Sequence, residues 1–458
     1  MLSFVLSLGD DSRSLGVCTW LPWPRGRTSD LAAGGTEVVA GMISVGEARR
    51  YVLSCCRPLA PVDLAPAECL GLVLAEPVQA EEDVPHFANS SMDGYAVRSA
   101  DVARAPVRLK VVGELMAGDD PAELLVGEGA AVRIMTGAVL PAGADAVCMV
   151  EHTRSENGVV VIEEAVARGT FVRPAGSDIA SGSVVFAAGA RIGPAHIGIL
   201  ASLGATHVTV YPRPRVGVVS SGDELVVGAA PLAMGKIRDS NRPALLAQLG
   251  ADRFDPVDLG HVGDDPDALA RVIQDGVSRC DAVLTSGGVS VGDRDMVKVV
   301  LEKLGGGGAR WLQVAVKPAK PFAFSTVPPG GVPVFGLPGN PVSALVSYEL
   351  FARPALRLMA GHANLGRPMV TATAAGDLHR TPDGKLHLVR VAITASADGT
   401  LRAEVSGGQS SHQMSALAAA HALALVPDGD GVAAGEPVRA WLLDEEALAA
   451  PGADLGLA

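Results

Sequence analysis

The chain has 458 residues, more than one hydrophobic core normally organises, so we expect several domains. Its 50 acidic residues against 37 basic ones give a net charge of −13, which argues against a protein that binds a nucleic-acid backbone. We expect no membrane partner either, because no apolar stretch is long enough to span a bilayer. A small anionic ligand is compatible with this charge, since a local group of Lys and Arg can attract an anion.

The cysteines and the first residues bear on where the protein resides. Six cysteines are scattered along the chain without a CxxC pair, which is typical of buried thiols in a reducing cytoplasm. The first residues lack the basic start of a signal peptide. We therefore predict a cytoplasmic protein. Residues 11–41 show no clear period, so the first 41 residues are either an unstructured extension or sequence that precedes a natural start at Met42.

The first predicted element is a helix, and a β-rich region follows it. Residues 44–47 (SVGE) are a capping box, and apolar residues on one helical face continue from it until the helix ends before Pro58. Four apolar runs of strand length then predict the β-rich region, at 107–112, 131–135, 145–150 and 158–163.

Three polar loops lie in and around this β-rich region. The turn SMDG contains Asp93, the strand end RIMTG contains Thr136, and the loop RPAGSD ends at Asp178. By itself, Asp93 is better explained as a turn residue than as a catalytic one. None of the three loops indicates a function when it is taken alone.

From about residue 213, apolar strands alternate with amphipathic helices. This alternation predicts a parallel sheet with helices on both faces, and ligands bind such sheets beyond the carboxyl ends of the strands. The expected strands lie at 216–220, near 257, and at 282–284, 311–316 and 332–335, and the expected helices lie at 242–249, 266–277, 295–304 and from 341 onward. Three loops belong to that edge, and their recurrence favours a binding site more than any one of them does: 220–224 (SSGDE), 286–288 (SGG) and 336–341 (GLPGNP).

The segment 280–304 joins a buried strand, a glycine loop and the start of a helix. Free backbone N–H groups and a helix N-terminus suit an anion. The carboxylates of Asp293 and Asp295 would repel an anion, so a divalent cation held between acid and phosphate would reconcile them. A simple helix cap at Asp295, worth about 0.5–2 kcal/mol, explains this stretch equally well.

Glu224 and Asp264 also lie just past a predicted strand or at the start of the next helix. A doubly wound fold would bring them and Asp295 toward one crevice, where they could share a metal ion. The alternative is that Glu224 is a solvated loop acid and that Asp264 and Asp295 cap helices. In combination with the three glycine loops, the metal site is slightly the better supported hypothesis.

Two lysines provide positive charge near the same sheet edge. Lys317 and Lys320 follow a strand, prolines stiffen the backbone between them, and apolar residues flank them. This context places the ammonium groups at a rim, where an oxyanion is the natural counter-charge. No GxSxG, HExxH, Walker A or GxGxxG motif is convincing, which argues against serine hydrolases, zinc proteases, P-loop enzymes and dinucleotide dehydrogenases.

Beyond residue 361 the helical signal fades and alternating apolar runs predict a C-terminal β-domain. Four scattered histidines show no ligand spacing and are interpreted as structural: His86, His152, His412 and His421. The predicted strands of this domain lie at 369–374, 386–393, 401–405 and 437–442, around one helix near 415–422.

A set of long motifs, all in one order, carries a resemblance to a known family. The motifs are SMDGYAV at 91, RIMTGA at 133, RPAGSDI at 173, SSGDEL at 220, DSNR at 239, GDDP at 263, SGGVSVGDRD at 286, KPAKPFAF at 317 and GLPGNPVSA at 336. Through them the chain, from about residue 42 to residue 443, resembles the molybdopterin molybdenumtransferase family, which includes MoeA and the gephyrin E domain. So many motifs in sequence make the resemblance highly specific.

The resemblance implies a multidomain α/β and β fold and an elongated homodimer. The implied active cleft lies between the α/β domain of one subunit and the inserted domain of the other. Further implied partners are the molybdopterin adenylyltransferase and apo-molybdoenzymes. The implied parts are a linker domain in two pieces (42–82 and 180–212), an inserted β-rich domain (83–179), a doubly wound α/β molybdopterin-binding domain (213–360), a C-terminal β-barrel (361–445), an N-terminal extension (1–41) and a tail (446–458).

The implied reaction takes molybdate and adenylylated molybdopterin, leaves molybdenum on the dithiolene and releases AMP with Mg²⁺ or a similar ion. Splitting a phosphoanhydride needs metal charge on the phosphoryl oxygens, which agrees with the acids found above. The resemblance implies Glu224, Asp264 and Asp295 as catalytic metal ligands, joined by Asp93, Thr136 and Asp178. The implied substrate-binding residues are Ser220, Ser221, Gly222, Ser286, Gly287, Gly288, Lys317, Lys320, Pro338, Asn340, Pro341, Ser343, Arg390 and Ser411.

Two other functions remain open: a molybdopterin-binding scaffold or paralogue without insertase activity, and a molybdopterin adenylyltransferase. The retained acids argue against a pure scaffold. The additional domains argue against the adenylyltransferase, whose family resembles the α/β domain alone. One departure from the family pattern is His421, in an Ala-His-Ala sequence where the family often has Ala-Asn-Gly. It puts that turn of the barrel in question and leaves the main cleft unaffected.

Overall fold

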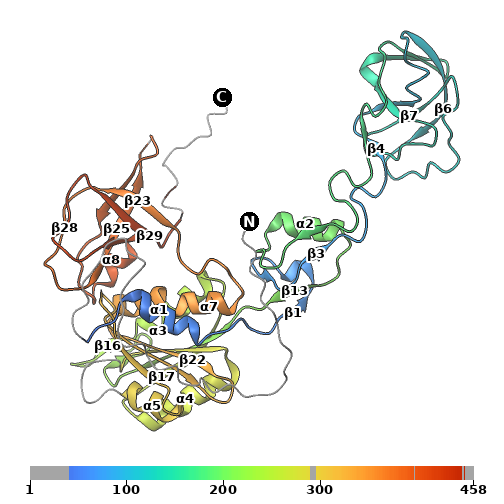
Figure 1. Cartoon of the computed structure of the whole chain (residues 1–458). Helices are drawn as coiled ribbons and strands as arrows, with labels where there is room; N and C mark the ends of the chain where they lie inside the picture. Colours follow the sequence, from blue (N-terminus) through green and yellow to red (C-terminus); the bar gives the residue numbers. More distant parts are fainter. Residues whose placement is uncertain (1–40, 289–295, 397, 446–447, 449–458) are drawn as a thin grey trace. The chain divides into compact units, whose positions relative to one another are not determined.

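The computed structural model describes residues 41–288, 296–396, 398–445 and 448 (Figure 1). The predicted N-terminal extension, apart from Gly41, lies outside the described residues, and so do Asp293 and Asp295. Residues Ala60–Pro212 form one compact unit, and the rest of the chain forms a second. Within the described part of the chain, no helix combines the length and the apolar character that crossing a membrane requires.

In the unit Ala60–Pro212, a small sheet packs against helix α2 (Pro194–Ser202). Leu74, Leu200 and Val210 are buried in the core between them. The sheet has the order β1 (Val62–Leu64), β13 (Val208–Tyr211), β2 (Val73–Leu74). The short elements beside it are η1 (Pro66–Glu68) and the pair β3 (Val78–Gln79) and β12 (Val184–Phe186).

The same unit contains a six-stranded sheet with apolar side chains on both faces. The successive residues Tyr95 and Ala96 belong to different cores, as the alternation of a strand requires. The strand order is β8 (Ala146–Met149), β5 (Gly94–Val97), β7 (Ala130–Ile134), β6 (Val107–Leu115), β10 (Val159–Ile162), β9 (Thr153–Glu156). The four predicted apolar runs correspond to β6, β7, β8 and β10. The pair β4 (Asn89–Ser90) and β11 (Val172–Arg173) and the turn η2 (Val150–His152) complete this part.

The second unit is built on a six-stranded sheet with the order β17 (Asp255–Val262), β14 (Arg215–Ser221), β18 (Ala282–Ser286), β22 (Val332–Leu337), β21 (Pro321–Val327), β19 (Arg310–Gln313). The first four strands are parallel, as predicted. The strand β21 was not predicted, and it runs antiparallel to both of its neighbours, β22 and β19. A short turn joins β21 to β22, and only antiparallel neighbours can be joined in that way.

Helices cover both faces of this sheet, so the fold is doubly wound (Figure 1). Val218 and Val219 are successive residues of β14 and lie in different cores, which places the cores on opposite faces. One core contains helices α1 (Val45–Ser54), α3 (Asn241–Ala251), α6 (Pro341–Ser347) and α7 (Arg353–Met359) and the π-helix η3 (Tyr348–Ala352). The other contains α4 (Pro266–Arg279) and α5 (Met296–Leu304). A two-stranded parallel pair, β15 (Leu225–Val226) and β16 (Ile237–Arg238), lies between β14 and α3 in the chain.

Helix α1 has the predicted capping box, with Glu47 N donating to Ser44 Oγ at 3.2 Å and Ser44 N donating to Glu47 Oε2 at 2.8 Å. Its buried residues Ala48 and Val52 pack into the α/β core, whereas the chain joins the other unit only from Ala60. The expected linker piece 42–82 stays a prediction, as does the rest of the four-domain division.

The C-terminal strands form a closed five-stranded barrel within the second unit. The order is β25 (Leu386–Ala395), β26 (Leu401–Val405), β23 (Met369–Ala374), β29 (Pro437–Leu442), β27 (Ala422–Val426), and β27 pairs again with β25. The strand β20 (Val316–Lys317) pairs with β25 and so connects the barrel to the α/β part. The remaining elements are β24 (Leu378–His379), β28 (Gly431–Val432) and helix α8 (Met414–Ala418).

The departure at His421 leaves the turn before β27 intact. The His421 backbone N–H donates to Val391 O at 2.9 Å, and the His421 carbonyl accepts from Leu443 N at 2.8 Å. The ring Nδ1 lies 3.1 Å from Ile393 N. The histidine therefore takes part in closing the barrel.

Candidate active site

The three predicted loops meet at one edge of the α/β sheet. Ser220 pairs with Ser286 across β14 and β18, and Ser286 pairs with Leu337 across β18 and β22. From β14 the chain passes through α3 to β17 on one side, and it then returns through α4 to β18 on the other side. The carboxyl ends of β14 and β18 therefore form the switch point where open α/β sheets bind ligands.

Close backbone packing at this edge explains one of the glycines. Gly287 has φ +101°, and a Cβ placed on it would lie 2.3 Å from Ser221 O. A side chain at this position would force the loops apart. The loop 286–288 is therefore held directly against the end of β14.

The serines at the strand ends have different surroundings. The Ser220 hydroxyl donates to Asp239 Oδ2 at 2.7 Å. The Ser221 hydroxyl is buried and has no hydrogen-bond partner among the residues that the structure describes. A buried hydroxyl without a partner is costly, and a bound ligand would satisfy it.

The loop after β22 leads into helix α6, as the sequence predicts. Asn340 is the N-cap residue and Pro341 the first residue of α6, but the Asn340 side chain makes no capping hydrogen bond. Pro338 is buried at the end of β22, and Ser343 is buried in the first turn of α6. These residues thus line up along the third loop and the helix start that follows it.

The acids Glu224 and Asp264 lie on neighbouring loops. Gly222 N donates to Val262 O at 3.1 Å, and Asp264 N donates to Asp223 Oδ1 at 3.0 Å, so the loops after β14 and β17 are tied together. Both Glu224 and Asp264 are exposed. The structure thus places these two acids on adjoining loops, while Asp295 lies outside the described residues.

The capping alternative for Asp264 is not supported. Asp265 is the N-cap of α4, and its Oδ1 accepts from Asp267 N at 2.9 Å and from Ala268 N at 3.2 Å. In the described ranges no group of three His, Cys, Asp or Glu side chains could hold a metal ion. Two carboxylates together with substrate phosphates are a normal Mg²⁺ environment, so the donor chemistry of Glu224 and Asp264 fits that ion.

The predicted oxyanion residues lie where the barrel adjoins the α/β part. Lys317 and Lys320 are exposed, whereas Arg390 of β25 is fully buried. Arg390 Nη2 donates to Gly408 O at 2.6 Å and to Ser410 O at 3.3 Å, and the next residue, Ser411, accepts from Val342 N at 3.1 Å. The loop that carries Ser411 therefore contacts both Arg390 and the start of α6.

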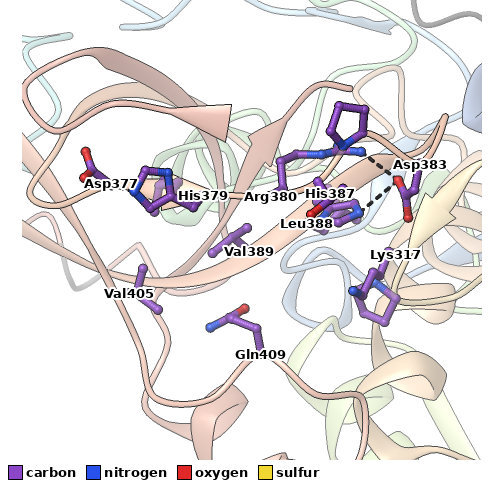
Figure 2. Close-up of a pocket in the computed structure, with 14 residues that line it drawn as sticks. Lys317, Asp377, His379, Arg380, Asp383, His387, Leu388, Val389, Val405 and Gln409 are labelled. Atoms are coloured by element: carbon purple, nitrogen blue, oxygen red, sulfur yellow. Dashed lines mark hydrogen bonds and ion pairs between the residues drawn. The ribbon is translucent and has the colours of Figure 1, made fainter. Parts of the chain in front are cut away.

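A pocket of about 510 Å³ opens beside Lys317 (Figure 2). Its polar lining includes His379, Arg380, Asp383 and His387 from the barrel. Asp383 lies between Arg380, at 2.7 Å from Nη2, and His387, at 3.2 Å from Nε2. These contacts tie the loop after β24 to β25 at the pocket wall.

The partly buried carboxylate of Asp383 at this wall predicts an acid-sensitive barrel. Burial alone would raise the pKa of Asp383, but hydrogen bonds from Lys385 and His387 outweigh it and lower the pKa to about 2. Since the folded pKa is below the unfolded value, the carboxylate stabilises the fold at higher pH. That stabilisation is lost as the pH falls from about 4 to about 2. Asp383→Asn should therefore be less stable than the natural chain at pH 5, and the difference should shrink toward pH 2 in urea unfolding. A difference independent of pH would contradict this assignment.

In the unit Ala60–Pro212, the structure brings Asp93 and Thr136 together. Asp93 Oδ1 accepts from Thr136 N at 2.7 Å and from Thr136 Oγ1 at 2.7 Å. Both residues are exposed. Asp178 lies on a separate loop after β11, where its backbone N–H donates to Val84 O at 3.0 Å.

The Thr136 contacts should control the charge of Asp93. The backbone hydrogen bond from Thr136, followed by the hydroxyl, lowers the pKa of Asp93 below its ordinary value. Thr136→Val removes the hydroxyl and keeps the backbone bond, so the pKa of Asp93 should rise part of the way back. Thr136→Ser should leave it unchanged. Titration of the Asp93 carboxyl carbon by NMR measures both, and an unchanged pKa in Thr136→Val would contradict the assignment.

Two residues at this site were not predicted to have a role. Asp239 and Asn241 contact Ser220, Ser286 and Gly339 through hydrogen bonds of 2.7–2.8 Å. The motif DSNR at 239–242 was the available signal, but polar residues at a helix start are most simply explained as caps. The partners are too far away in the chain for local pattern to reveal them.

Comparison with known proteins identifies the family. Three family models match: the MoeA N-terminal region (domain I and II) over residues 43–204, a probable molybdopterin binding domain over 217–358, and the MoeA C-terminal region (domain IV) over 371–443. The chain is 40% identical to a molybdopterin molybdenumtransferase of Nostoc sp., over 79% of this chain and 83% of that protein. It is 36% identical to molybdopterin molybdenumtransferase 2 of Mycobacterium tuberculosis, over 87% of this chain and 99% of that protein.

Solved structures agree with the sequence relatives. The crystal structure of a molybdopterin biosynthesis MoeA protein from Pyrococcus horikoshii matches with a TM-score of 0.75 and 29% identity. The match covers 88% of this chain and 99% of that one. Together with the doubly wound sheet, its switch-point loops and the closed barrel, these matches show that the chain belongs to the molybdopterin molybdenumtransferase (MoeA) family.

Proposed function

We propose that this chain transfers molybdenum from molybdate to adenylylated molybdopterin and releases AMP, as a step of molybdenum cofactor biosynthesis. The observation that carries the proposal is the meeting of loops 220–224, 286–288 and 336–341 at the switch point of the sheet. Two exposed acids adjoin that edge. Of the lysines suited to an oxyanion, Lys317 ends β20 and Lys320 follows it. Membership of the family supports the same reaction.

We assign different donor groups of the chain to the two substrates. The glycine loops beyond the strand ends bind the anionic pterin substrate. The Ser221 hydroxyl adds a donor, because it is buried without a hydrogen-bond partner among the described residues. Lys317, Lys320, Arg390 and Ser411 attract and orient molybdate. Glu224, Asp264 and Asp295 would hold Mg²⁺, whose charge neutralises the phosphoryl oxygens when AMP leaves.

The proposal extends to the assembly. Asp93, Thr136 and Asp178 act on the same substrates from the inserted domain of a second subunit, so the working form is a homodimer. The protein works in the cytoplasm, with the molybdopterin adenylyltransferase as supplier and apo-molybdoenzymes as recipients.

The test is a reaction of the purified full chain with adenylylated molybdopterin, Mg²⁺ and either molybdate or tungstate, with AMP release and metal on the pterin as readouts. A chelator should stop AMP release, and Mg²⁺ should restore it. Glu224→Ala, Asp264→Ala and Asp295→Ala should each lower the rate about 10²-fold, the scale expected when a charge-stabilising group is lost. Asp275→Ala is the control, because Asp275 is an exposed acid on α4 that pairs only with Arg279 in the described salt bridges.

Two outcomes would overturn the proposal. Full activity of Asp295→Ala would remove the metal role that is assigned to this acid. Transfer of AMP from ATP onto molybdopterin would assign the chain to the preceding adenylylation step.

A further inference from the structure

Residues 239–242 (DSNR) at the start of α3 contact the ends of three site strands. Asp239 Oδ2 accepts from the Ser220 hydroxyl of β14 at 2.7 Å. Asn241 Nδ2 donates to Ser286 Oγ at the end of β18 at 2.8 Å and to Gly339 O after β22 at 2.7 Å. One short segment therefore connects all three loops that form the switch-point edge.

The chemistry of the two Asn241 contacts requires an amide. A backbone carbonyl can only accept, so the Gly339 carbonyl requires the amide nitrogen of Asn241 on its side. The two N–H groups of that nitrogen then serve the two loops, one each. A carboxylate at this position would face the Gly339 carbonyl with a lone pair and would hold neither loop in the same way.

The segment that carries Asn241 is itself fixed to the sheet. Arg242 Nε donates to Asp239 Oδ2 at 2.9 Å, and Arg242 Nη1 donates to Asp258 Oδ1 of β17 at 2.6 Å. The Asp239 side chain is 1% exposed and that of Arg242 is 10% exposed. This buried ion pair gives Asn241 a rigid base from which to hold the two more exposed loops.

We propose that Asn241 is a positioning residue that sets the spacing between loop 286–288 and loop 336–341. Its loss lets the loops separate and weakens binding of the pterin substrate, while the reacting groups themselves remain in place. The identity of that substrate rests on the proposed function, but the connection between the loops does not.

The experiment compares Asn241→Ala and Asn241→Asp with the natural chain and with Ser44→Ala. Ser44→Ala is the matched control, because it removes a helix cap of α1 without touching the strand ends. The first readout is hydrogen exchange of the free protein in peptides covering 282–288 and 336–341. The second is KM against kcat for AMP release from adenylylated molybdopterin.

Both Asn241 variants should speed exchange in the two peptides together and raise KM about tenfold, with kcat changed much less. Ser44→Ala should change neither readout. Unchanged exchange in either peptide would overturn the inference, as would a lower kcat with unchanged KM. If the natural chain releases no AMP, the proposed function fails, and the exchange result still decides whether Asn241 connects the loops.

Discussion

Replacing Asp252 by alanine should lower the free energy of unfolding of the α/β and barrel unit by about 3–5 kcal/mol. Asp252 ends α3, and its side chain is 5% exposed. Its carboxylate accepts from Tyr348 Oη at 2.8 Å, from Arg353 Nε at 2.9 Å and from Arg367 Nη2 at 3.2 Å. Without it, two buried guanidinium groups share the single carboxylate of Glu349.

Neighbouring charges in this cluster shift the pKa values of Arg367 and Tyr348. Burial by itself lowers the pKa of Arg367, but the hydrogen bond and charge of Glu349 and the charge of Asp252 outweigh it and raise the pKa. Burial, followed by the charge of Asp252, raises the pKa of Tyr348. In Asp252→Ala, Arg367 keeps its hydrogen bonds to Glu349 but loses the charge of Asp252, so an incompletely compensated charge remains.

Urea unfolding measures the effect, with Asp275→Ala as the control. Asp275 and Arg279 form an exposed pair on α4, with a distance of 2.8 Å and side chains 58% and 46% exposed. A pair of this kind contributes about 0–1 kcal/mol. If the two variants lose similar stability, the Asp252 cluster is not the strong interaction that its burial indicates.

The cluster also shows what local sequence pattern cannot predict. Asp252 and Arg367 are 115 positions apart, and their contact depends on how α3, η3 and the segment before β23 pack together. The capping box at Ser44, by contrast, was predictable, because all of its partners lie within three residues. Alternating strands and helices and the loops at the strand ends were predictable for the same reason, since hydrophobic period and glycine position are local signals.

The functional residues also divide into those that local sequence signals predict and those that depend on distant contacts. The loops that contain Ser220, Ser286 and Pro338 follow strands, so the rule for parallel sheets places them at one edge. The role of Asn241 was not predictable, because a polar residue at a helix start is normally explained as a cap. The antiparallel strand β21 was missed because its apolar run 322–324 was interpreted as the surroundings of two lysines. In each case the deciding contact lies far away in the chain.

The second large effect concerns Arg390 and molybdate. Molybdate should raise the melting temperature of the natural chain, and Arg390→Met should lose that response. Arg390 is fully buried, and its Nε and Nη1 atoms have no hydrogen-bond partner in the described part of the chain. Burial lowers the pKa of the guanidinium. A buried cation without a facing anion is costly, and an oxyanion supplies both the opposite charge and the missing acceptors.

Arg390 is closed off from solvent, and the loop that carries Gly408 and Ser410 contacts its guanidinium, so this loop would have to move for an anion to reach it. At about 100 times its dissociation constant, a ligand stabilises the folded state by about 2.7 kcal/mol, which is a measurable shift. Chloride at matched ionic strength is the salt control, and Arg279→Met is the matched variant, because Arg279 is an exposed arginine of α4. Arg279→Met should keep the full response to molybdate. An equal response in Arg390→Met would mean that the anion binds elsewhere, and the unpaired donors of Arg390 would then be no part of the molybdate site.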